Sequence, residues 1–289
     1  MPALPLGEYV QLLLKNGLLA DDTTPALDLT RTVSSLTCDS RAAVPGSLFI
    51  CKGAAFKKEY LAQALSRGAF AYVSEREYDL PAPCIRVPDV RHAMGLMADL
   101  CWGHPSGQVK VIGITGTKGK TTTAYFLKSI LDAWREERGL HPVGLLSTLV
   151  TDDGVLRAPA VLTTPEPLEL QHHLWNAAQA GCGYVVMECS SQALKYGRMV
   201  GVELFAGAFL NLGEDHISPR EHPTAEDYFR SKLKIFDHSK NAVVNLDSDR
   251  APEVLAAAQR CDRVLTYSLD TPSADLFAPR LTHGWEGSR

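Results

Sequence analysis

The chain has 289 residues, which predicts about two domains, and 45% of its residues are hydrophobic, enough for sizeable cores. A formal net charge of -4 excludes a nucleic-acid binder that depends on bulk positive charge. Seven cysteines without a C-x-x-C pair indicate reduced thiols rather than a disulfide framework. No apolar run is long enough to span a membrane, and the N-terminus lacks the pattern of a signal peptide. These features favour a cytosolic protein.

Two α/β regions meet near a Gly-, Pro- and Ser-rich stretch at residues 101–108. Before it, strands are expected at 47–53 and 69–75, with a helix at 60–68 between them. After it, apolar runs alternate with helical segments such as 121–134, as in a doubly wound parallel sheet covered on both faces. The strands expected there are 109–115, 143–150, 184–191, 204–212, 241–247 and 263–269. We therefore predict an N-terminal α/β domain over 1–107 and a central, mostly parallel α/β domain over 108–289.

A glycine-rich loop between the strand expected at 109–115 and the following helix is the strongest functional signal. Its glycines let backbone amides approach phosphate oxygens, Lys120 supplies a positive charge, and Thr121 offers a hydroxyl to magnesium. Ile114 stands where the common motif has glycine, so the loop is a variant. A turn that merely begins a helix is the alternative, and Gly-Lys-Thr at a strand-to-helix junction argues against it. The residues expected to hold the nucleotide phosphates are Gly116, Thr117, Lys118, Gly119, Lys120, Thr121 and Thr122.

Acidic and histidine side chains follow two of the expected strands. Glu188 comes near the end of 184–191, while Glu214, Asp215 and His216 follow 204–212. Doubly wound sheets bind ligands at the carboxyl ends of their strands, and magnesium requires hard oxygen ligands. Glu188 and His216 are therefore candidate metal ligands. The alternatives are a solvated strand end for Glu188 and an ordinary loop histidine for His216.

An amphipathic helix is expected at 224–236. At about 100° per residue, Lys232 falls in the middle of its apolar face, between Tyr228 and Phe236, whereas Lys234 lies on the opposite face. Burial there disfavours the ammonium form and lowers the pKa of the lysine. The alternative is a lysine whose stem packs on the apolar face while its head reaches water.

Six motifs in a fixed order give the chain a family resemblance: CDSRAAVPGSLFICKG, GITGTKGKTTT, LTTPEP, MECSSQALKYGR, NLGEDHIS and YFRSKLKIF. The chain resembles the Mur ligases, ATP-dependent amide-forming enzymes of peptidoglycan assembly, and among them the UDP-N-acetylmuramoyl-tripeptide synthetases. The resemblance implies a nucleotide-sugar-binding N-terminal domain, a central ATPase domain and a C-terminal domain. The chain ends before that last domain, which selects the incoming amino acid. We therefore expect a truncated chain with little activity by itself.

The resemblance also assigns site residues. It implies a carbamate on Lys232, derived from carbon dioxide, that helps to hold magnesium. The expected metal ligands are Thr121, Glu188, His216 and Lys232, and the expected catalytic residues are Lys120, Lys232 and His216. The expected substrate-binding residues are Ser40, Ala54 and Ala55 at the uridine end, and Thr163, Thr164, Ser190 and Arg198 at the muramoyl-peptide end. For Ser40 the alternative is a turn residue, and for Arg198 a surface charge.

The implied reaction joins an amino acid to UDP-N-acetylmuramoyl-dipeptide through an acyl phosphate, with ATP and Mg²⁺ as cofactors. The implied enzyme is a cytoplasmic monomer without nucleic-acid or membrane partners. Two departures concern substrate contacts: Lys118 stands where many tripeptide synthetases have asparagine, and Gln192 replaces a common histidine. Two alternatives stay open, a non-catalytic module that keeps the nucleotide-sugar pocket and a ligase similar to folylpolyglutamate synthetases. The CDSR motif of the first domain argues against the second.

Overall fold

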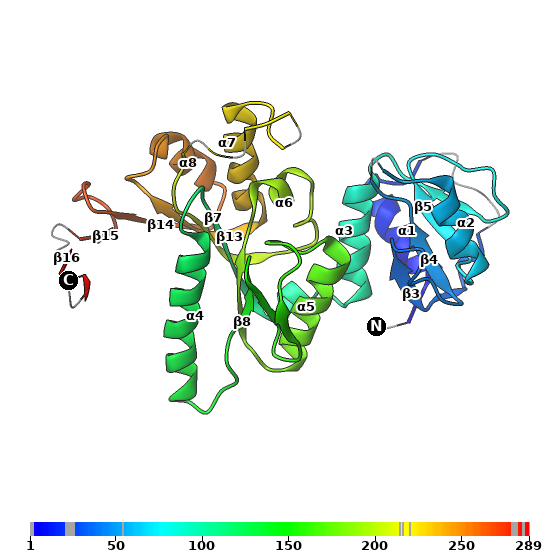
Figure 1. The fold of residues 1–289 in the computed structure, drawn as a ribbon, viewed down its shortest axis with the longest axis horizontal. Coiled ribbons are helices and arrows are strands. Elements are labelled where there is room, and N and C mark those ends of the chain that lie inside the picture. Colours follow the sequence, from blue (N-terminus) through cyan, green and yellow to red (C-terminus); the bar gives the residue numbers. More distant parts are fainter. Residues whose placement is uncertain are drawn as a thin grey trace. The chain divides into compact units, whose positions relative to one another are not determined.

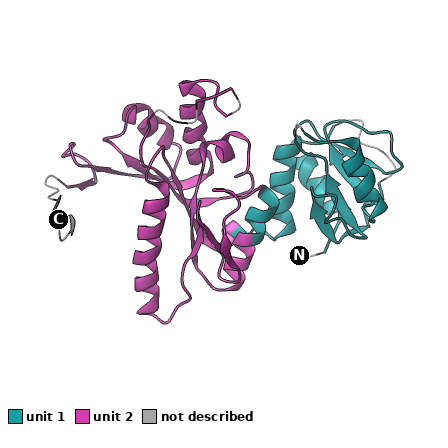
Figure 2. Ribbon diagram, viewed as in Figure 1, with its two compact units in different colours: residues 1–105, 167–172 teal, residues 106–166, 173–289 magenta. Residues whose placement is uncertain are grey.

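A computed structural model shows a mixed α/β protein, and the fold class predicted above is confirmed. The chain divides into two compact units, coloured separately in Figure 2. Unit 1 contains 1–105 and 167–172, and unit 2 contains 106–166 and 173–289. All seven cysteines are free thiols. Within the described part of the chain, no helix has the length and apolar character needed to cross a membrane. The structure describes residues 3–20, 27–53, 55–213, 215, 217–219, 221–278, 283–284 and 287–288.

Unit 1 is built on a small parallel sheet with the strand order β3-β4-β5-β6. Alternate residues of β4 face opposite sides, as the period of a strand requires. Leu48 joins the core formed with α1 and α3, while Phe49 joins the core formed with α2. The sheet is therefore covered on both faces, which explains its continuous apolar strands. The elements are β1 (Leu4–Pro5), α1 (Leu6–Lys15), β2 (Thr32–Val33), β3 (Ser35–Thr37), β4 (Ser47–Ile50), α2 (Lys58–Ser66), β5 (Ala71–Ser74), β6 (Cys84–Arg86) and α3 (Val90–Cys101).

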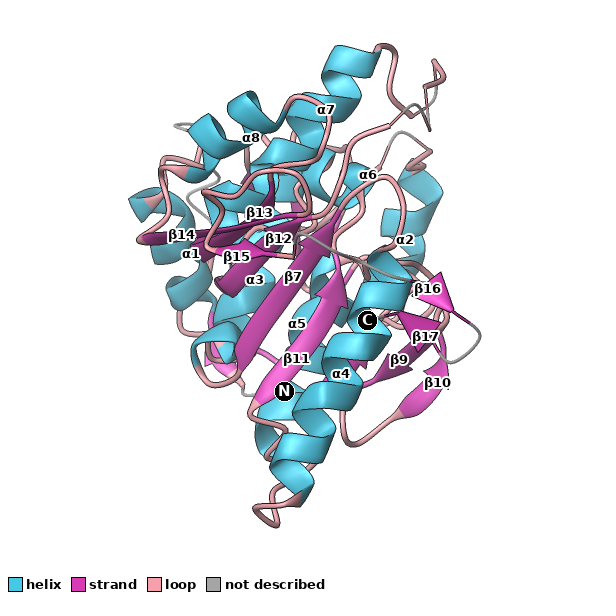
Figure 3. Cartoon of the chain, turned by 90° about the vertical axis from the view of Figure 1, so that its left-hand side faces the viewer, coloured by secondary structure: helices cyan, strands magenta, loops and turns pink. Residues whose placement is uncertain are grey.

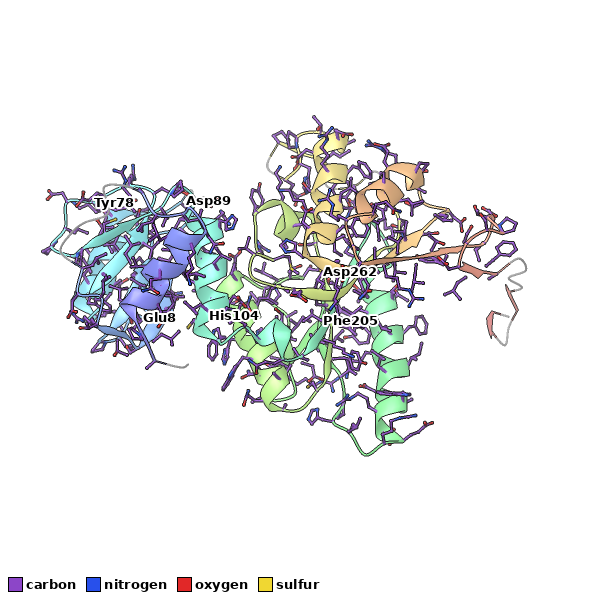
Figure 4. All side chains as sticks on the ribbon, turned by 180° about the vertical axis from the view of Figure 1, so that it is seen from behind. Glu8, Tyr78, Asp89, His104, Phe205 and Asp262 are labelled. Atoms are coloured by element: carbon purple, nitrogen blue, oxygen red, sulfur yellow. The ribbon has the colours of Figure 1, made fainter. Side chains whose placement is uncertain are left out.

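Polar side chains fix both ends of α3. The carboxylate of Asp89 accepts hydrogen bonds from the backbone amides of Arg91 and His92, which caps the start of the helix. Beyond its last turn, His104 Nδ1 lies 2.6 Å from a carboxylate oxygen of Asp99. Figure 4 labels Asp89 and His104 near the two ends of this helix.

Unit 2 is built on a nine-stranded sheet with the order β10-β9-β8-β11-β7-β12-β13-β14-β15. Figure 1 labels β7, β8, β13, β14 and β15 of this sheet. Every neighbouring pair from β8 to β15 is parallel, and β9 and β10 extend one edge in antiparallel fashion. The elements with all or most of their residues in this unit are η1 (Pro105–Gly107), β7 (Lys110–Thr115), α4 (Lys120–Glu136), β8 (Gly144–Leu146), β9 (Val150–Asp152), β10 (Arg157–Pro159), α5 (Pro167–Gln179), β11 (Tyr184–Glu188), α6 (Ser191–Lys195), β12 (Leu204–Phe209), α7 (Ala225–Leu233), η2 (Lys234–His238), β13 (Ser239–Asn245), α8 (Ala251–Ala258), β14 (Arg263–Ser268), β15 (Leu276–Phe277), β16 (His283–Gly284) and β17 (Gly287–Ser288).

The middle of this sheet brings three strand ends together. β7 lies between β11 and β12, and Glu188 at the end of β11 pairs with Ile114 of β7. The loops after β7, β11 and β12 therefore leave the same edge of the sheet. In Figures 1 and 3, α4 lies on one face of the strands and the 173–179 part of α5 on the other. This is the arrangement in which doubly wound sheets bind ligands at the carboxyl edge.

Several predicted elements differ from the structure. The strand expected over 184–191 ends at Glu188, and its last residue, Ser191, begins α6. The strand expected over 143–150 is a hairpin of β8 and β9, because Ser147 Oγ accepts hydrogen bonds from the amides of Leu149 and Val150 and closes a turn. The helix expected over 224–236 ends at Leu233 and continues as the 3₁₀ segment η2. These local changes do not alter the order of the strands in the sheet.

Candidate active site

A cavity of about 510 Å³ opens at the carboxyl edge of the unit 2 sheet. The residues that line it come from the loops after β7, β8 and β10, the start of α4, the end of β11, α6 and the segment after it, and α7 and the segment before it. Most of the residues predicted for the nucleotide, the metal and the muramoyl-peptide are therefore neighbours in space.

The glycine-rich loop is fixed by contacts from other segments. Gly119 adopts a φ of 82°, the left-handed region that glycine tolerates, and directly precedes α4. Asn211 Oδ1, just after β12, accepts hydrogen bonds from the amides of Thr117 at 3.0 Å and Lys118 at 2.9 Å. The hydroxyl of Tyr228 in α7 donates to Thr117 Oγ1 at 3.3 Å. The loop is therefore held in one conformation by two elements that are distant in sequence.

Lys120 lies half-buried at the mouth of this loop. Its Nζ donates to the carbonyl oxygens of Gly116 at 2.8 Å and Thr117 at 3.3 Å. Burial lowers the pKa of Lys120, an effect that the nearby carboxylates of Glu188 and Asp215 oppose. Lys120 thus places a positive charge inside the cavity, where a phosphate group would pair with it.

The carboxylate of Glu188 is fully buried and bound to two threonines. Thr121 Oγ1 donates to its two oxygens at 2.9 and 3.0 Å. The backbone amide of Thr148 donates to Oε1 at 2.9 Å, and the hydroxyl of Thr148 lies 3.3 Å from Oε2. A carboxylate beside a threonine hydroxyl offers the hard oxygen ligands that magnesium prefers, so these residues fit that ion. His216 lies outside the described residues, and among those described no three His, Cys, Asp or Glu side chains form a metal-binding cluster.

Lys232 is buried on α7, on the face that the sequence predicted. Its exposed fraction is 1%, whereas Lys234 is exposed to solvent. Lys232 Nζ donates to the carbonyl oxygen of Gly116 at 2.8 Å and lies 4.3 Å from the centre of the Tyr228 ring. Burial and the positive charge of Lys120 lower the pKa of Lys232 to about 7. Burial therefore favours the neutral form of this amine more than it would for an exposed lysine.

Three of the four residues predicted for the muramoyl-peptide line the same cavity as Glu188. Thr163 and Ser190 line the cavity, and Thr163 Oγ1 lies 3.2 Å from Thr148 Oγ1. Thr164 is fully buried and does not line it. Its hydroxyl donates to the backbone oxygen of Glu188 at 2.8 Å and accepts from the amide of Ser190 at 3.0 Å. Thr164 therefore holds Glu188 and Ser190 in position and does not itself face the cavity.

Arg198 lines the same cavity with a largely buried side chain, 15% exposed, so it is not a surface charge. Its Nε lies 2.8 Å from a carboxylate oxygen of Glu166, and one terminal nitrogen donates to the backbone oxygen of Thr164 at 3.2 Å. The guanidinium is therefore held in a defined orientation next to Thr163 and Ser190. Such a fork suits paired hydrogen bonds to a carboxylate or phosphate.

The residues predicted for the uridine end lie in unit 1. Ser40 is largely buried, and its hydroxyl donates to Gln63 Oε1 at 2.6 Å. Ala55 is exposed, and Ala54 lies outside the described residues. A cavity of about 540 Å³ in this unit includes Cys51 and Gly53 in its lining, but neither Ser40 nor Ala55. The uridine contacts therefore stay a prediction.

Comparison with known proteins decides the family. Residues 114–289 match the Mur ligase middle domain. The chain belongs to the Mur ligase family. The resemblance found in the sequence motifs is thus confirmed.

This Mur ligase chain is similar to the UDP-N-acetylmuramoyl-L-alanyl-D-glutamate–L-lysine ligase of Enterococcus faecalis, with 42% identity over 80% of the chain and 45% of that protein. Its structure is similar to that of a UDP-N-acetylmuramoyl-L-alanyl-D-glutamate–2,6-diaminopimelate ligase, with a TM-score of 0.80, 25% identity, and coverage of 99% of this chain and 57% of that one. A MurF ligase of Thermotoga maritima in complex with ADP shares the fold, with a TM-score of 0.56, 21% identity, and coverage of 83% and 51%. The chain spans less than half the length of its curated relative.

Sequence reasoning missed four groups of this Mur ligase site. Thr148 binds Glu188, Asn211 and Tyr228 hold the phosphate loop, and His222 bonds to Ser191. Asn211 and Tyr228 stand in two of the quoted motifs, NLGEDHIS and YFRSKLKIF, but the motifs do not say what these side chains contact. These contacts join segments that are remote in sequence, and no spacing rule relates them.

Proposed function

We propose that this Mur ligase chain belongs to a cytoplasmic, ATP-dependent ligase that adds an amino acid to UDP-N-acetylmuramoyl-dipeptide during peptidoglycan precursor synthesis. Its relative from Enterococcus faecalis is named for L-lysine addition, which makes L-lysine the first amino acid to test. The observation that carries the proposal is the convergence of Lys120, the Thr121–Glu188 pair, Lys232 and Arg198 on one cavity. That cavity contains groups suited to phosphate, to a divalent cation and to a carboxylate.

The central domain, 108–289, would bind ATP through the phosphate loop. Asn211 fixes the loop, and Lys120 brings its charge to the terminal phosphates. The complex of the Thermotoga maritima MurF ligase with ADP supports the choice of nucleotide. Phosphoryl transfer needs chiefly positioning and charge neutralisation, and both follow from a rigid loop with a lysine inside it.

Thr121, Glu188, His216 and a carbamate on Lys232 would hold magnesium. When bound, the ion neutralises charge on the transferring phosphoryl group. The carbamate forms when the neutral amine adds to carbon dioxide and a proton leaves the nitrogen. Two properties of Lys232 support this modification: it is 1% exposed, and its pKa is lowered to about 7. An unmodified ammonium at this place would repel a cation, whereas a carbamate gives it anionic oxygens.

Thr163, Ser190 and Arg198 would hold the muramoyl-peptide, with Thr164 behind them. The N-terminal domain, 1–107, would bind the uridine end through Ser40, Ala54 and Ala55. The terminal carboxylate of the acceptor attacks the γ-phosphate of ATP, so that an acyl phosphate and ADP form. The amine then displaces phosphate and forms the amide. Arg198 orients the acceptor for the first step, because its guanidinium is already fixed by Glu166.

Calorimetry on the full-length natural protein tests the substrate class. Binding of UDP-N-acetylmuramoyl-dipeptide should be detected, and a folate should bind more weakly or not at all. Arg198→Ala should lower the affinity for UDP-N-acetylmuramoyl-dipeptide by roughly 30-fold, which corresponds to about 2 kcal/mol for a charged hydrogen bond. Arg230→Ala is the matched control, since that side chain is 77% exposed on α7. Tighter binding of the folate would overturn the proposal.

A further inference from the structure

Three side chains form a continuous hydrogen-bonded chain that begins in the cavity wall. Ser191, the first residue of α6, lines the cavity and is 5% exposed. Its Oγ lies 3.0 Å from His222 Nε2, and His222 Nδ1 lies 2.7 Å from Asp227 Oδ2. His222 is fully buried. The order hydroxyl, imidazole, carboxylate allows a histidine to take a proton from a hydroxyl.

The charge of Asp227 determines which nitrogen of His222 carries the hydrogen. A hydrogen bond from Lys195 lowers the pKa of Asp227, burial acts in the opposite direction, and the bond from His222 lowers it further. Lys195 Nζ lies 2.7 Å from the same carboxylate oxygen. An ionised Asp227 accepts a hydrogen bond, so Nδ1 of the neutral imidazole must be the donor. The lone pair of Nε2 is then directed at the hydroxyl of Ser191.

The other ionisable groups near His222 leave this arrangement intact. Tyr228 of α7 packs edge-on against the imidazole, with 5.1 Å between the ring centres. Glu221 directs its side chain to Gln192, whose amide donates to Oε1 at 2.9 Å. Lys195 donates to the backbone oxygen of Glu221 at 2.9 Å as well as to Asp227. The imidazole of His222 therefore keeps the carboxylate of Asp227 at one nitrogen and the hydroxyl of Ser191 at the other.

We propose that Ser191 and His222 accept the proton that the incoming amino acid must lose before it attacks the acyl phosphate. This inference rests on the proposed ligase function and deepens it. An amino acid arrives as an ammonium at neutral pH, because the pKa of an α-amino group is about 8, and an ammonium has no lone pair for attack. Nothing in the proposed roles of Lys120, Glu188, Lys232 or Arg198 provides a base for this amine.

The proton path can be written atom by atom. The ammonium gives one proton to Ser191 Oγ while Ser191 passes its own proton to His222 Nε2. The freed lone pair forms the C–N bond to the acyl carbon, the C–O bond to phosphate breaks, and the leaving phosphate takes the second proton from nitrogen. His222 is left as an imidazolium beside the carboxylate of Asp227, and it returns its proton through Ser191 after the product leaves.

A purely structural tie between α6 and the segment before α7 is the competing explanation. Gln192 and Lys195 of α6 already hold that segment through the side chain and backbone of Glu221. The Ser191–His222 bond repeats this attachment and differs from it in opening onto the cavity. If the Ser191–His222 bond is only structural, its loss should lower the rates of all partial reactions to the same extent. If the bond serves to accept a proton, its loss should slow only the reactions whose nucleophile arrives protonated.

Two nucleophiles separate these roles in the full-length natural protein with ATP, magnesium and UDP-N-acetylmuramoyl-dipeptide. Hydroxylamine is neutral at pH 7 and captures an acyl phosphate as a hydroxamate without a base, whereas L-lysine requires deprotonation. Ser191→Ala should keep hydroxamate formation and slow amide formation by about 10²-fold, the usual worth of a general base. The deficit should shrink as the pH rises above about 8, where the free amine becomes abundant. His222→Gln should show the same selectivity, with circular dichroism confirming its fold.

Ser231→Ala is the matched control, because it removes a hydroxyl that contacts the backbone oxygen of Asp227 but lies outside the chain of three. It should change neither reaction. Equal losses of hydroxamate and amide in Ser191→Ala, or no loss of either, would overturn the proton-accepting role while the ligase function stands. If wild-type protein formed neither product, the proposed function itself would fail.

Discussion

Lys120 and Lys232 donate to the same acceptor, the carbonyl oxygen of Gly116, each at 2.8 Å. One comes from the start of α4 and the other from α7, so two lysine amino groups converge in a largely buried place. Burial lowers the pKa of both, and the charge of Lys120 lowers that of Lys232 further. A carbamate on Lys232 would replace this repulsion by attraction. The pair therefore connects the phosphate loop with the proposed modification.

A pair of lysine substitutions tests that modification. In the full-length natural protein, Lys232→Ala should lose most ligase activity, because the cavity loses anionic oxygens for the cation. A short carboxylate such as acetate, added at high concentration, should restore part of the activity. Lys234→Ala, on the exposed side two residues away, should change stability by no more than about 0.5 kcal/mol and leave activity near normal.

The measurement is the rate of phosphate release together with mass spectrometry of the intact protein. A mass increase on the wild type, but not on Lys232→Ala, is expected in bicarbonate buffer. Equal activities of the two variants would identify Lys232 as an ordinary buried lysine. Full activity of the wild type without carbon dioxide would contradict the carbamate as well.

Lys120→Ala should abolish ATP turnover while the fold persists. The variant loses the charge that neutralises the terminal phosphates, for which a loss of at least about 10²-fold is expected. Stability should change little, since burial disfavours the ammonium of Lys120 in the folded protein. Phosphate release and thermal unfolding measured on the same sample check both parts. Near-normal turnover would exclude the nucleotide assignment.

Asn211→Ala should loosen the phosphate loop without removing any charge. The side chain holds the amides of Thr117 and Lys118 and donates to the backbone oxygen of Lys118 at 3.1 Å. A mobile loop pays more ordering entropy when it binds phosphate, so the KM for ATP should rise about tenfold with a smaller change in kcat. Steady-state kinetics separates the two constants. A fall in kcat with an unchanged KM would assign Asn211 to the chemical step instead.

The sequence predicts those parts of the site whose residues lie close together along the chain. Gly116, Lys120 and Thr121 lie in one loop, so their spacing alone indicates phosphate binding, and the position of Lys232 follows from the helical period. Asn211 and His222 act on partners in other segments, and their roles follow only from strand order and loop paths. The hairpin of β8 and β9 was missed because a Ser147 side chain, rather than Gly or Pro, closes its turn.

Asp153 gives the unit 2 fold a defined dependence on acid. Burial alone would raise its pKa, but hydrogen bonds from His173, Leu156, Asn176 and Val155 lower it from 3.8 to about 2. A depressed carboxylate pKa contributes stability that is complete above pH 3.8 and is lost as the pH falls through about 2. Asp153→Asn should therefore lower the free energy of unfolding by about 2 kcal/mol at neutral pH. The stability of this variant should fall less steeply between these two pH values than that of the wild type. Urea unfolding at several pH values checks this, and an unchanged pH dependence would contradict it.

Product formation by the full-length natural protein is the most direct test of the ligase assignment. The protein should be incubated with UDP-N-acetylmuramoyl-dipeptide, ATP, magnesium and L-lysine, and the products measured by mass spectrometry together with ADP. The ligase assignment predicts one ADP for each new amide bond, and neither product with Lys120→Ala. If the muramoyl-dipeptide binds but no amide forms with any amino acid tested, the chain belongs to a binding module, and the ligase assignment is contradicted.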